Sequence, residues 1–266
     1  MSWGRGCVSG SRSFLLSMGP LPEPRAYIIA ATPRCGSYFL CELLWNTNVC
    51  GHPSEYALPD ARTGADSQAS NEDYLQRYLV DGWTRNGVFG AKLMWEQYSQ
   101  LAEDLSSTRP LSDPERHDVF LQGFGSCKFV RLRRRDKLRQ AISYYRAIVT
   151  NEWHRTLNAA RPDRPIACNP DAIDQLVADI AQQDARWEAF LDAAEPECLR
   201  LDYEDIQHDP EGAISTIFGF LGVTEPWQFT PGDLLQQADA VTERLIEEYQ
   251  TVRDARSREA AIACAT

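Results

Sequence analysis

Donor groups suited to an anion gather in one short segment near the start of the chain, Thr32-Pro33-Arg34-Cys35-Gly36-Ser37-Tyr38. The Arg34 guanidinium carries a fixed charge on planar, forked donors that match a phosphate or sulfate group. The side chains of Ser37 and Tyr38 add hydroxyl donors. The segment contains no lysine and does not follow Walker A spacing. It indicates an anion-binding turn, with an ordinary strand-to-helix turn as the alternative.

The residues around this segment predict the elements that hold it. Residues 27–31 form a short apolar run typical of a buried strand, and Pro33 and Gly36 mark a loop after it. Ser37 is predicted to cap a helix with an apolar face of Phe39, Leu40, Leu43 and Leu44. A helix that begins directly after a strand offers unpaired N–H groups and a positive dipole end to an anion.

Two candidates for proton transfer follow in the loop Gly51-His52-Pro53-Ser54-Glu55-Tyr56. The Glu55 carboxylate and the His52 imidazole could each serve as general base towards a hydroxyl group within hydrogen-bond reach. The alternative for each residue is a solvated loop side chain, because loops routinely carry such residues.

Lys92 lies inside the otherwise apolar residues 87–95, which are predicted to form a second strand. A lysine in a buried strand is costly unless its ammonium group reaches a partner or a ligand. Lys92 is therefore a candidate site residue, with a lysine that extends from a strand end into water as the alternative.

The order of strand, basic turn and helix is predicted a second time further along the chain. The third predicted strand covers residues 127–132, the basic turn 133–136 and the helix 137–153. Arg134 in the turn and Ser143 in the helix could converge on a phosphate group. The alternatives are a solvated basic turn that nearby acids balance, and an ordinary small helix residue.

Strands alternate with helices along the rest of the chain. Residues 198–203 are predicted to form a fourth strand, and helices are predicted at 72–84, 171–193, 210–221 and 239–262, whereas 106–125 are predicted as a loop with short helical pieces. This alternation predicts an α/β fold with a mostly parallel central sheet flanked by helices. Arg34, Lys92, Arg134 and Tyr203 fall at or near strand ends, where ligands bind in such folds.

Composition narrows the function classes. The chain has 266 residues and a net charge of −11, which argues against general nucleic-acid binding. No apolar run is long enough to span a bilayer, and no export signal is recognisable, so we expect a cytoplasmic protein. We expect a disordered extension over residues 1–23, a single domain over 24–256 and a frayed terminus over 257–266.

Cysteine and histidine spacing gives no sign of a metal centre. The eight cysteines and four histidines are scattered through the chain without pairs at metal-ligand spacing. We therefore predict reduced thiols and no metal.

Taken together, five segments resemble the Stf0-type sulfotransferases, the bacterial group that includes trehalose 2-sulfotransferase. The similar segments are Thr32-Pro33-Arg34-Cys35-Gly36-Ser37-Tyr38, Gly51-His52-Pro53-Ser54-Glu55-Tyr56, the run from Asn86 to Trp95, the run from Arg134 to Ala147, and Gln237-Ala238-Asp239. Leu201-Asp202-Tyr203-Glu204-Asp205 also resembles a Tyr-Glu-Asp segment of sulfotransferases in general. The segments occur in the family's order across residues 25–256, and the ordered set is more specific than any single motif.

The resemblance implies a P-loop-like sulfotransferase fold and transfer of a sulfuryl group from 3′-phosphoadenosine 5′-phosphosulfate to a hydroxyl acceptor. That acceptor would be a small molecule or a carbohydrate such as trehalose or a glycolipid. The implied catalytic residues are Glu55 as base, Arg34 and Lys92. The implied donor-binding residues are Arg34, Cys35, Gly36, Ser37, Tyr38, Arg134, Ser143 and Tyr203. The implied acceptor-binding residues are Pro33, His52 and Glu55.

Departures from the family pattern keep alternatives open. Pro33, Tyr38 and His52 stand where the group has glutamine, threonine and glutamate. A P-loop-type nucleotide or sugar kinase, or a degenerate nucleotide-binding protein, is the alternative function. The group tends to form dimers, so a homodimer is also expected.

Overall fold

Four parallel strands form the central sheet in the computed structural model, which describes residues 25–55, 81–106, 110–124, 127–153, 166–232 and 240–264. They are β1 (Arg25–Ala31), β2 (Val88–Met94), β3 (Cys127–Arg133) and β4 (Cys198–Asp202), in the order β2-β1-β3-β4. Each neighbouring pair is parallel. The predicted α/β class with a parallel sheet flanked by helices is confirmed.

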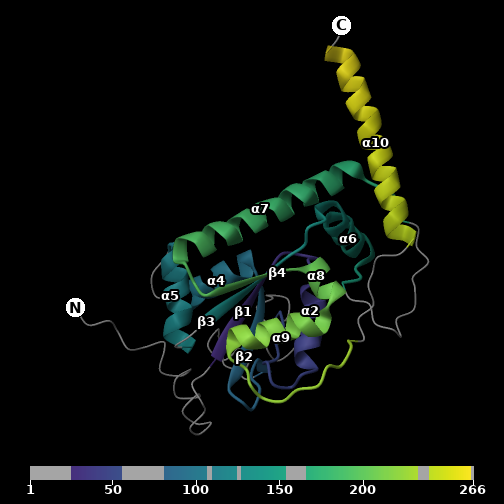
Figure 1. Cartoon of the computed structure of the whole chain (residues 1–266). Helices are drawn as coiled ribbons and strands as arrows, with labels where there is room; N and C mark the ends of the chain where they lie inside the picture. The colour runs from purple at the N-terminus through teal and green to yellow at the C-terminus, as the bar shows by residue number, and fades with distance from the viewer. Residues whose placement is uncertain are drawn as a thin grey trace.

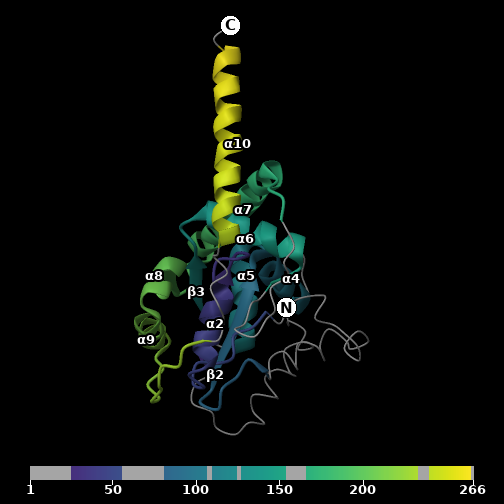
Figure 2. The same ribbon diagram turned by 90° about the vertical axis from the view of Figure 1, so that its right-hand side faces the viewer.

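Helices cover both faces of the sheet (Figures 1 and 2). One layer contains α2 (Ser37–Trp45), α8 (Tyr203–His208) and α9 (Pro210–Leu221), and the other contains α4 (Trp95–Leu105), α5 (Asp113–Phe124) and α7 (Pro170–Ala194). Successive side chains of β1 explain the two layers: Ile29 packs with the first set and Ile28 with the second. The central strand is buried on both faces, as is typical of parallel sheets.

A third apolar cluster joins α6 (Lys137–Thr150), α7 and the start of α10 (Ala240–Cys264). Arg253 and Arg256 of α10 also pair with Asp174 and Asp171 of α7, and past these contacts the helix extends away from the rest of the described chain (Figures 1 and 2). Its residues from Arg253 onward are exposed as far as side chains are described. The helix reaches Cys264, well into residues 257–266, for which we expected fraying.

Three local predictions differ from the structure. Gly36, in the left-handed conformation, occupies the N-cap position of α2, and Ser37 is the first helical residue. Residues 113–124, predicted as mostly loop, form a regular helix, because α5 packs Val119 and Leu121 against the core beside α4. Trp95, expected at a strand end, begins α4. The predicted helix at 72–84 lies almost wholly outside the described residues, as do Tyr56, the extension at 1–23 and Gln237-Ala238-Asp239.

Strand order determines which loops meet. The chain leaves β1 for β2 on one side and later returns to pair β3 on the other side of β1. The order therefore reverses between β1 and β3, and parallel α/β sheets bind ligands at the carboxyl ends of strands at such a point. The turn after β1 carries Arg34, and the turn after β3 carries Arg134.

Candidate active site

The turn after β1 has an unusual backbone. Arg34 has φ of 62° and Gly36 has φ of 92°, both in the left-handed region. A Cβ atom on Gly36 would lie 2.1 Å from Cδ2 of Tyr203, so only glycine fits beneath that ring. No side chain of the described residues caps the start of α2. The first N–H groups of a helix lack partners within the helix, so this end of α2 suits an anion.

Hydrogen bonds from neighbouring elements hold this turn in place. The fully buried Gln140 of α6 donates its amide to Thr32 Oγ1 (3.0 Å) and to the Pro33 carbonyl (2.8 Å). Arg134 donates to the Arg34 carbonyl at 3.3 Å. Within the turn, the Cys35 N–H donates to the Thr32 carbonyl at 3.2 Å. A strained backbone of this kind persists only where its surroundings determine it, as they do here.

Positive charge is concentrated around Arg34. Its Nε donates to Ser143 Oγ at 3.1 Å, and its guanidinium also donates to the Trp153 carbonyl. Burial, followed by the charges of Arg134 and Arg146, lowers the pKa of Arg34 to about 10. Guanidinium groups that repel one another in a desolvated region favour a bound anion, which would relieve that repulsion.

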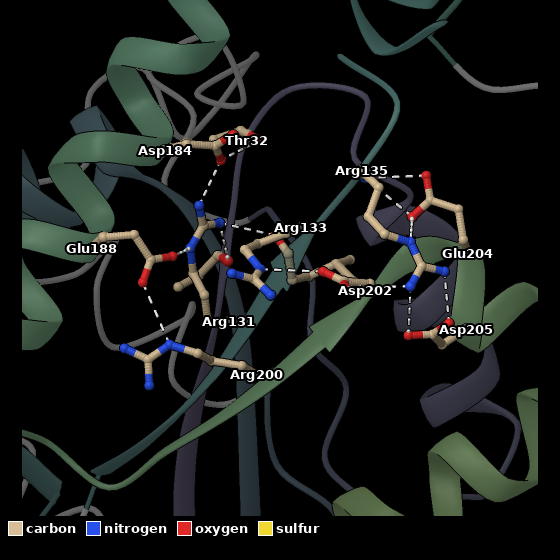
Figure 3. Close-up of polar contacts among 12 residues, drawn as sticks. Thr32, Arg131, Arg133, Arg135, Asp184, Glu188, Arg200, Asp202, Glu204 and Asp205 are labelled. Atoms are coloured by element: carbon tan, nitrogen blue, oxygen red, sulfur yellow. Dashed lines mark hydrogen bonds and ion pairs between the residues drawn. The ribbon is translucent and has the colours of Figure 1, made fainter.

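Arg134 differs from the arginines beside it. Arg133 pairs with Asp202 at 3.2 Å, and Arg135 pairs with Asp205 at 2.7 Å (Figure 3). Among the described residues Arg134 forms no ion pair; its guanidinium lies 4.9 Å from the Tyr203 ring centroid, and its Nε is buried without a hydrogen-bond partner. A basic turn balanced by acids therefore describes the two flanking arginines. The Arg134 guanidinium keeps donor capacity for a ligand.

A second cluster surrounds Glu55. The fully buried Lys92 ammonium contacts one carboxylate oxygen of Glu55, and Gln97 Nε2 donates to the other at 3.0 Å. Lys92 Nζ also lies 3.6 Å from the centroid of the Tyr38 ring. Burial, and then the Glu55 charge, raises the pKa of Tyr38 to about 12, so this hydroxyl stays protonated at neutral pH. Lys92 is thus a buried, paired lysine, and the alternative of a solvated strand-end lysine does not hold.

Two predicted acceptor residues, His52 and Pro33, are placed by backbone hydrogen bonds. The His52 backbone N–H donates to the Gly82 carbonyl at 3.0 Å, and the Pro33 carbonyl accepts from Gln140. These backbone contacts do not join either residue to the Glu55 cluster. The other predicted residues form two groups at the carboxyl edge of the sheet, one around Arg34 and one around Glu55. Tyr38, in the first turn of α2, links them.

A buried ion-pair network behind the turn was not found from the sequence. Arg131 of β3 is fully buried and pairs with Asp184 and Glu188 of α7, and Asp184 also accepts from the Thr32 hydroxyl (Figure 3). Lys137 donates to the second carboxylate oxygen of Asp184. The network ties β3 and α7 to the start of the turn. A charged residue within an apolar strand was the available signal, the same signal that singled out Lys92.

Other site residues also escaped sequence reasoning. Gln140 lies inside a segment that resembles the family, but nothing in its spacing predicted a contact with the first turn. Gln97 holds the third position of α4, where glutamine often caps a helix, yet that pattern does not predict a contact with Glu55. Nothing in the sequence predicted that the Trp153 carbonyl accepts a hydrogen bond from Arg34.

The described residues contain neither a cluster of metal ligands nor a membrane-spanning helix. No group of three or more histidine, cysteine, aspartate or glutamate side chains is arranged to hold a metal ion in that part of the chain. No described helix is long and apolar enough to cross a membrane.

A parallel α/β sheet with clustered arginines beside an uncapped helix start at its carboxyl edge is suited to phosphate or sulfate groups. The chain belongs to the Stf0 sulphotransferase family, whose model matches residues 26–252. It is 27% identical over 262 residues to the trehalose 2-sulfotransferase of Mycolicibacterium smegmatis, covering 88% of this chain and 96% of that protein. It is 23% identical over 255 residues to the trehalose 2-sulfotransferase of Mycobacterium tuberculosis (strain Erdman), covering 85% and 94%.

Among solved structures, a sulfotransferase from Alicyclobacillus acidocaldarius aligns with a TM-score of 0.49 and 15% identity. That alignment covers 87% of this chain and 93% of the other.

Proposed function

We propose that the protein transfers a sulfuryl group from 3′-phosphoadenosine 5′-phosphosulfate to a hydroxyl group of a carbohydrate. Membership in a sulfotransferase family supports the reaction class. The observation that carries the donor assignment is the buried Nε of Arg134, which has no hydrogen-bond partner among the described residues and lies beside the clustered charges of Arg34 and Arg146. A donor with a phosphosulfate at one end and a second phosphate at the other suits two adjacent arginine positions.

In this proposal the two turns share the donor. Arg34 and the N–H groups of Gly36 to Tyr38 hold the 5′-phosphosulfate, while Cys35 and Gly36 shape the turn. Arg134 and Ser143 hold the 3′-phosphate, and the Tyr203 ring supports both Gly36 and Arg134. The donor set consists of guanidinium, hydroxyl and backbone N–H groups, which is the chemistry that phosphate and sulfate oxygens require.

The Glu55 cluster is proposed to act on the acceptor. Glu55 takes the proton of the acceptor hydroxyl as that oxygen attacks sulfur, and the bond from sulfur to the bridging phosphate oxygen breaks in line with it. Lys92 and Arg34 stabilise the negative charge that develops during transfer. Trehalose is the first acceptor to try, because the two curated relatives reported above are trehalose 2-sulfotransferases. Pro33 and His52 remain candidate acceptor contacts.

Calorimetric titration with 3′-phosphoadenosine 5′-phosphate, repeated with AMP and with ATP in the absence of metal, tests the donor assignment. We expect tight binding that depends on the 3′-phosphate. A folded protein that ignores this nucleotide, or that prefers ATP, would overturn the donor assignment and favour a kinase.

The proposed base is tested by Glu55→Gln. Turnover should fall by roughly two to four orders of magnitude, because a positioned general base contributes that much. Affinity for 3′-phosphoadenosine 5′-phosphate should stay nearly unchanged, since the carboxylate lies outside the arginine cluster. Unchanged turnover would remove Glu55 from this role.

Two further predictions concern the whole molecule. A homodimer is tested by gel filtration with light scattering, and a cytoplasmic location by fractionation of cells that express the chain. Neither enters the mechanism above.

A further inference from the structure

Both oxygens of the Glu55 carboxylate are held, and by different kinds of donor. Lys92 supplies a full positive charge to Oε2, whereas Gln97 donates a neutral amide N–H to Oε1 at 3.0 Å. The Glu55 side chain is 15% exposed, so the carboxylate has little room to choose another orientation. Two contacts from two elements, β2 and α4, therefore define its direction.

The Gln97 amide is itself locked. Its Oε1 accepts from the Met94 backbone N–H at 2.8 Å, within the capping box at the start of α4. Since the amide oxygen is used by a backbone N–H, only the NH2 group can face Glu55. Gln97 also lies in the first turn of α4, which begins directly after β2, the strand that carries Lys92. The bond from the Met94 N–H therefore orients the Gln97 NH2 group towards the Glu55 carboxylate without any substrate.

We propose that Gln97 is a positioning residue that orients the Glu55 carboxylate to receive the acceptor proton. This inference rests on the proposed function. The bond to Oε1 keeps the Glu55 carboxylate in one orientation, and small misplacements of a reacting group cost up to about 100-fold in rate.

Gln97→Glu separates this role from helix capping. Glutamate at this position still accepts from the Met94 N–H, as in an ordinary capping box. Its second oxygen would face Glu55 as a like charge in place of a donor. Gln100→Glu is the matched control, because it adds the same charge to an exposed position of the same helix.

Steady-state transfer to trehalose, measured across a range of pH, gives the first readout. Gln97→Glu should lower kcat by about 10- to 100-fold and move the acid limb of the profile to higher pH by about one unit or more. Affinity for 3′-phosphoadenosine 5′-phosphate should stay within about threefold of wild type, and Gln100→Glu should match wild type. A Gln97→Glu enzyme that behaves like the control would overturn the proposal.

A reciprocal exchange gives the second readout. Glu55→Gln with Gln97→Glu restores an amide-to-carboxylate pair with reversed polarity, so the double variant should recover thermal stability lost in Gln97→Glu. It should not recover turnover, because position 55 then lacks a base. Recovery of turnover would overturn the proposal. If the wild type transfers no sulfuryl group, whether or not it binds the nucleotide, the proposed function has failed. The exchange would then report a structural contact only, and the positioning role of Gln97 would also be wrong.

Discussion

The turns after β1 and β3 have the same order of strand, basic turn and helix, but they differ in whether side chains cap the start of the helix. Among the described residues, no side chain caps α2, whose N-cap is the left-handed Gly36. In contrast, the Asp136 side chain caps α6 at the Arg139 N–H, and the Glu204 carboxylate accepts from the backbone N–H groups of Arg135 and Asp136. A helix start already occupied by carboxylates cannot serve an anion. Only the first turn keeps its helix dipole for a ligand.

The arginines of the two turns differ in the same way. Carboxylates of the β4–α8 corner neutralise Arg133 and Arg135 (Figure 3), whereas Arg134 points to Tyr203 and to the first turn. In the proposed site, the second turn therefore contributes a single guanidinium, and the first contributes backbone as well as side chain. Similar sequence patterns can thus supply different parts of one binding site.

Among the substitutions that test this difference between the two turns, Gly36→Ala should have the largest effect. A Cβ atom at φ 92° would meet the Tyr203 ring, and the displaced turn carries both Arg34 and the N–H groups of α2. We expect affinity for 3′-phosphoadenosine 5′-phosphate to fall by about 100-fold or more, since each lost charge-assisted hydrogen bond is worth roughly 1.5–3 kcal/mol. Unfolding free energy should also fall by about 1–3 kcal/mol.

Gly219→Ala is the control for that change. Gly219 lies within α9, and nothing lies within 4 Å of a Cβ atom built there. Alanine should raise stability by roughly 0.5–1 kcal/mol and leave nucleotide binding unchanged. Equal effects of the two substitutions would show that the first turn has no special requirement for glycine.

Arg134→Ala and Arg135→Ala test whether one arginine of the second turn serves the ligand. Loss of the Arg134 guanidinium should weaken binding of 3′-phosphoadenosine 5′-phosphate by about 10- to 100-fold, and binding of AMP much less. Arg135→Ala should leave both affinities within about twofold, because its charge is used by exposed carboxylates. Calorimetry measures both affinities for each variant. An equal loss of affinity in the two variants would show that these arginines do not differ in ligand binding.

Glu204→Ala removes the carboxylate from the second turn. The N–H groups of Arg135 and Asp136 then depend on water, so unfolding free energy should fall by about 1 kcal/mol in urea titrations. Nucleotide affinity should change by less than about threefold, because the helix start proposed to bind phosphate is that of α2. Strong new binding of inorganic phosphate would instead show that the second helix start is a latent anion site.

Tyr38→Phe has the smallest expected effect and concerns pH alone. Burial raises the pKa of Tyr38 from an ordinary value of 10.0 to about 12, so the folded state holds this proton more tightly than the unfolded chain. Tyr38 therefore contributes stability that is present below about pH 10 and is lost as the pH rises toward about 12. Unfolding free energy of the variant should decline less steeply between about pH 10 and about pH 12. Parallel curves for the two proteins would contradict the burial of this hydroxyl.

Local pattern was enough to predict much of the framework. The strands at β1, β2, β3 and β4 and the helices α6, α7 and α9 follow from apolar period and from capping residues, since these signals are set by neighbours in the chain. The helix α5 was missed because its apolar face is weak and becomes clear only against the core. The ordered family segments in turn pointed to Arg34, Glu55, Lys92 and Arg134 before any geometry was known.

By itself, the sequence therefore determined the fold class and the family, and it singled out the segments of the proposed site. The tertiary structure alone decided which charges remain for chemistry. The partners of Arg135 and Arg131 come from β4–α8 and α7, which lie 70 and 53 residues further along the chain. Glu55 and Gln97 meet across 42 residues. Pairing over such separations depends on strand order and packing, so a run of three arginines cannot reveal which one is left for a ligand.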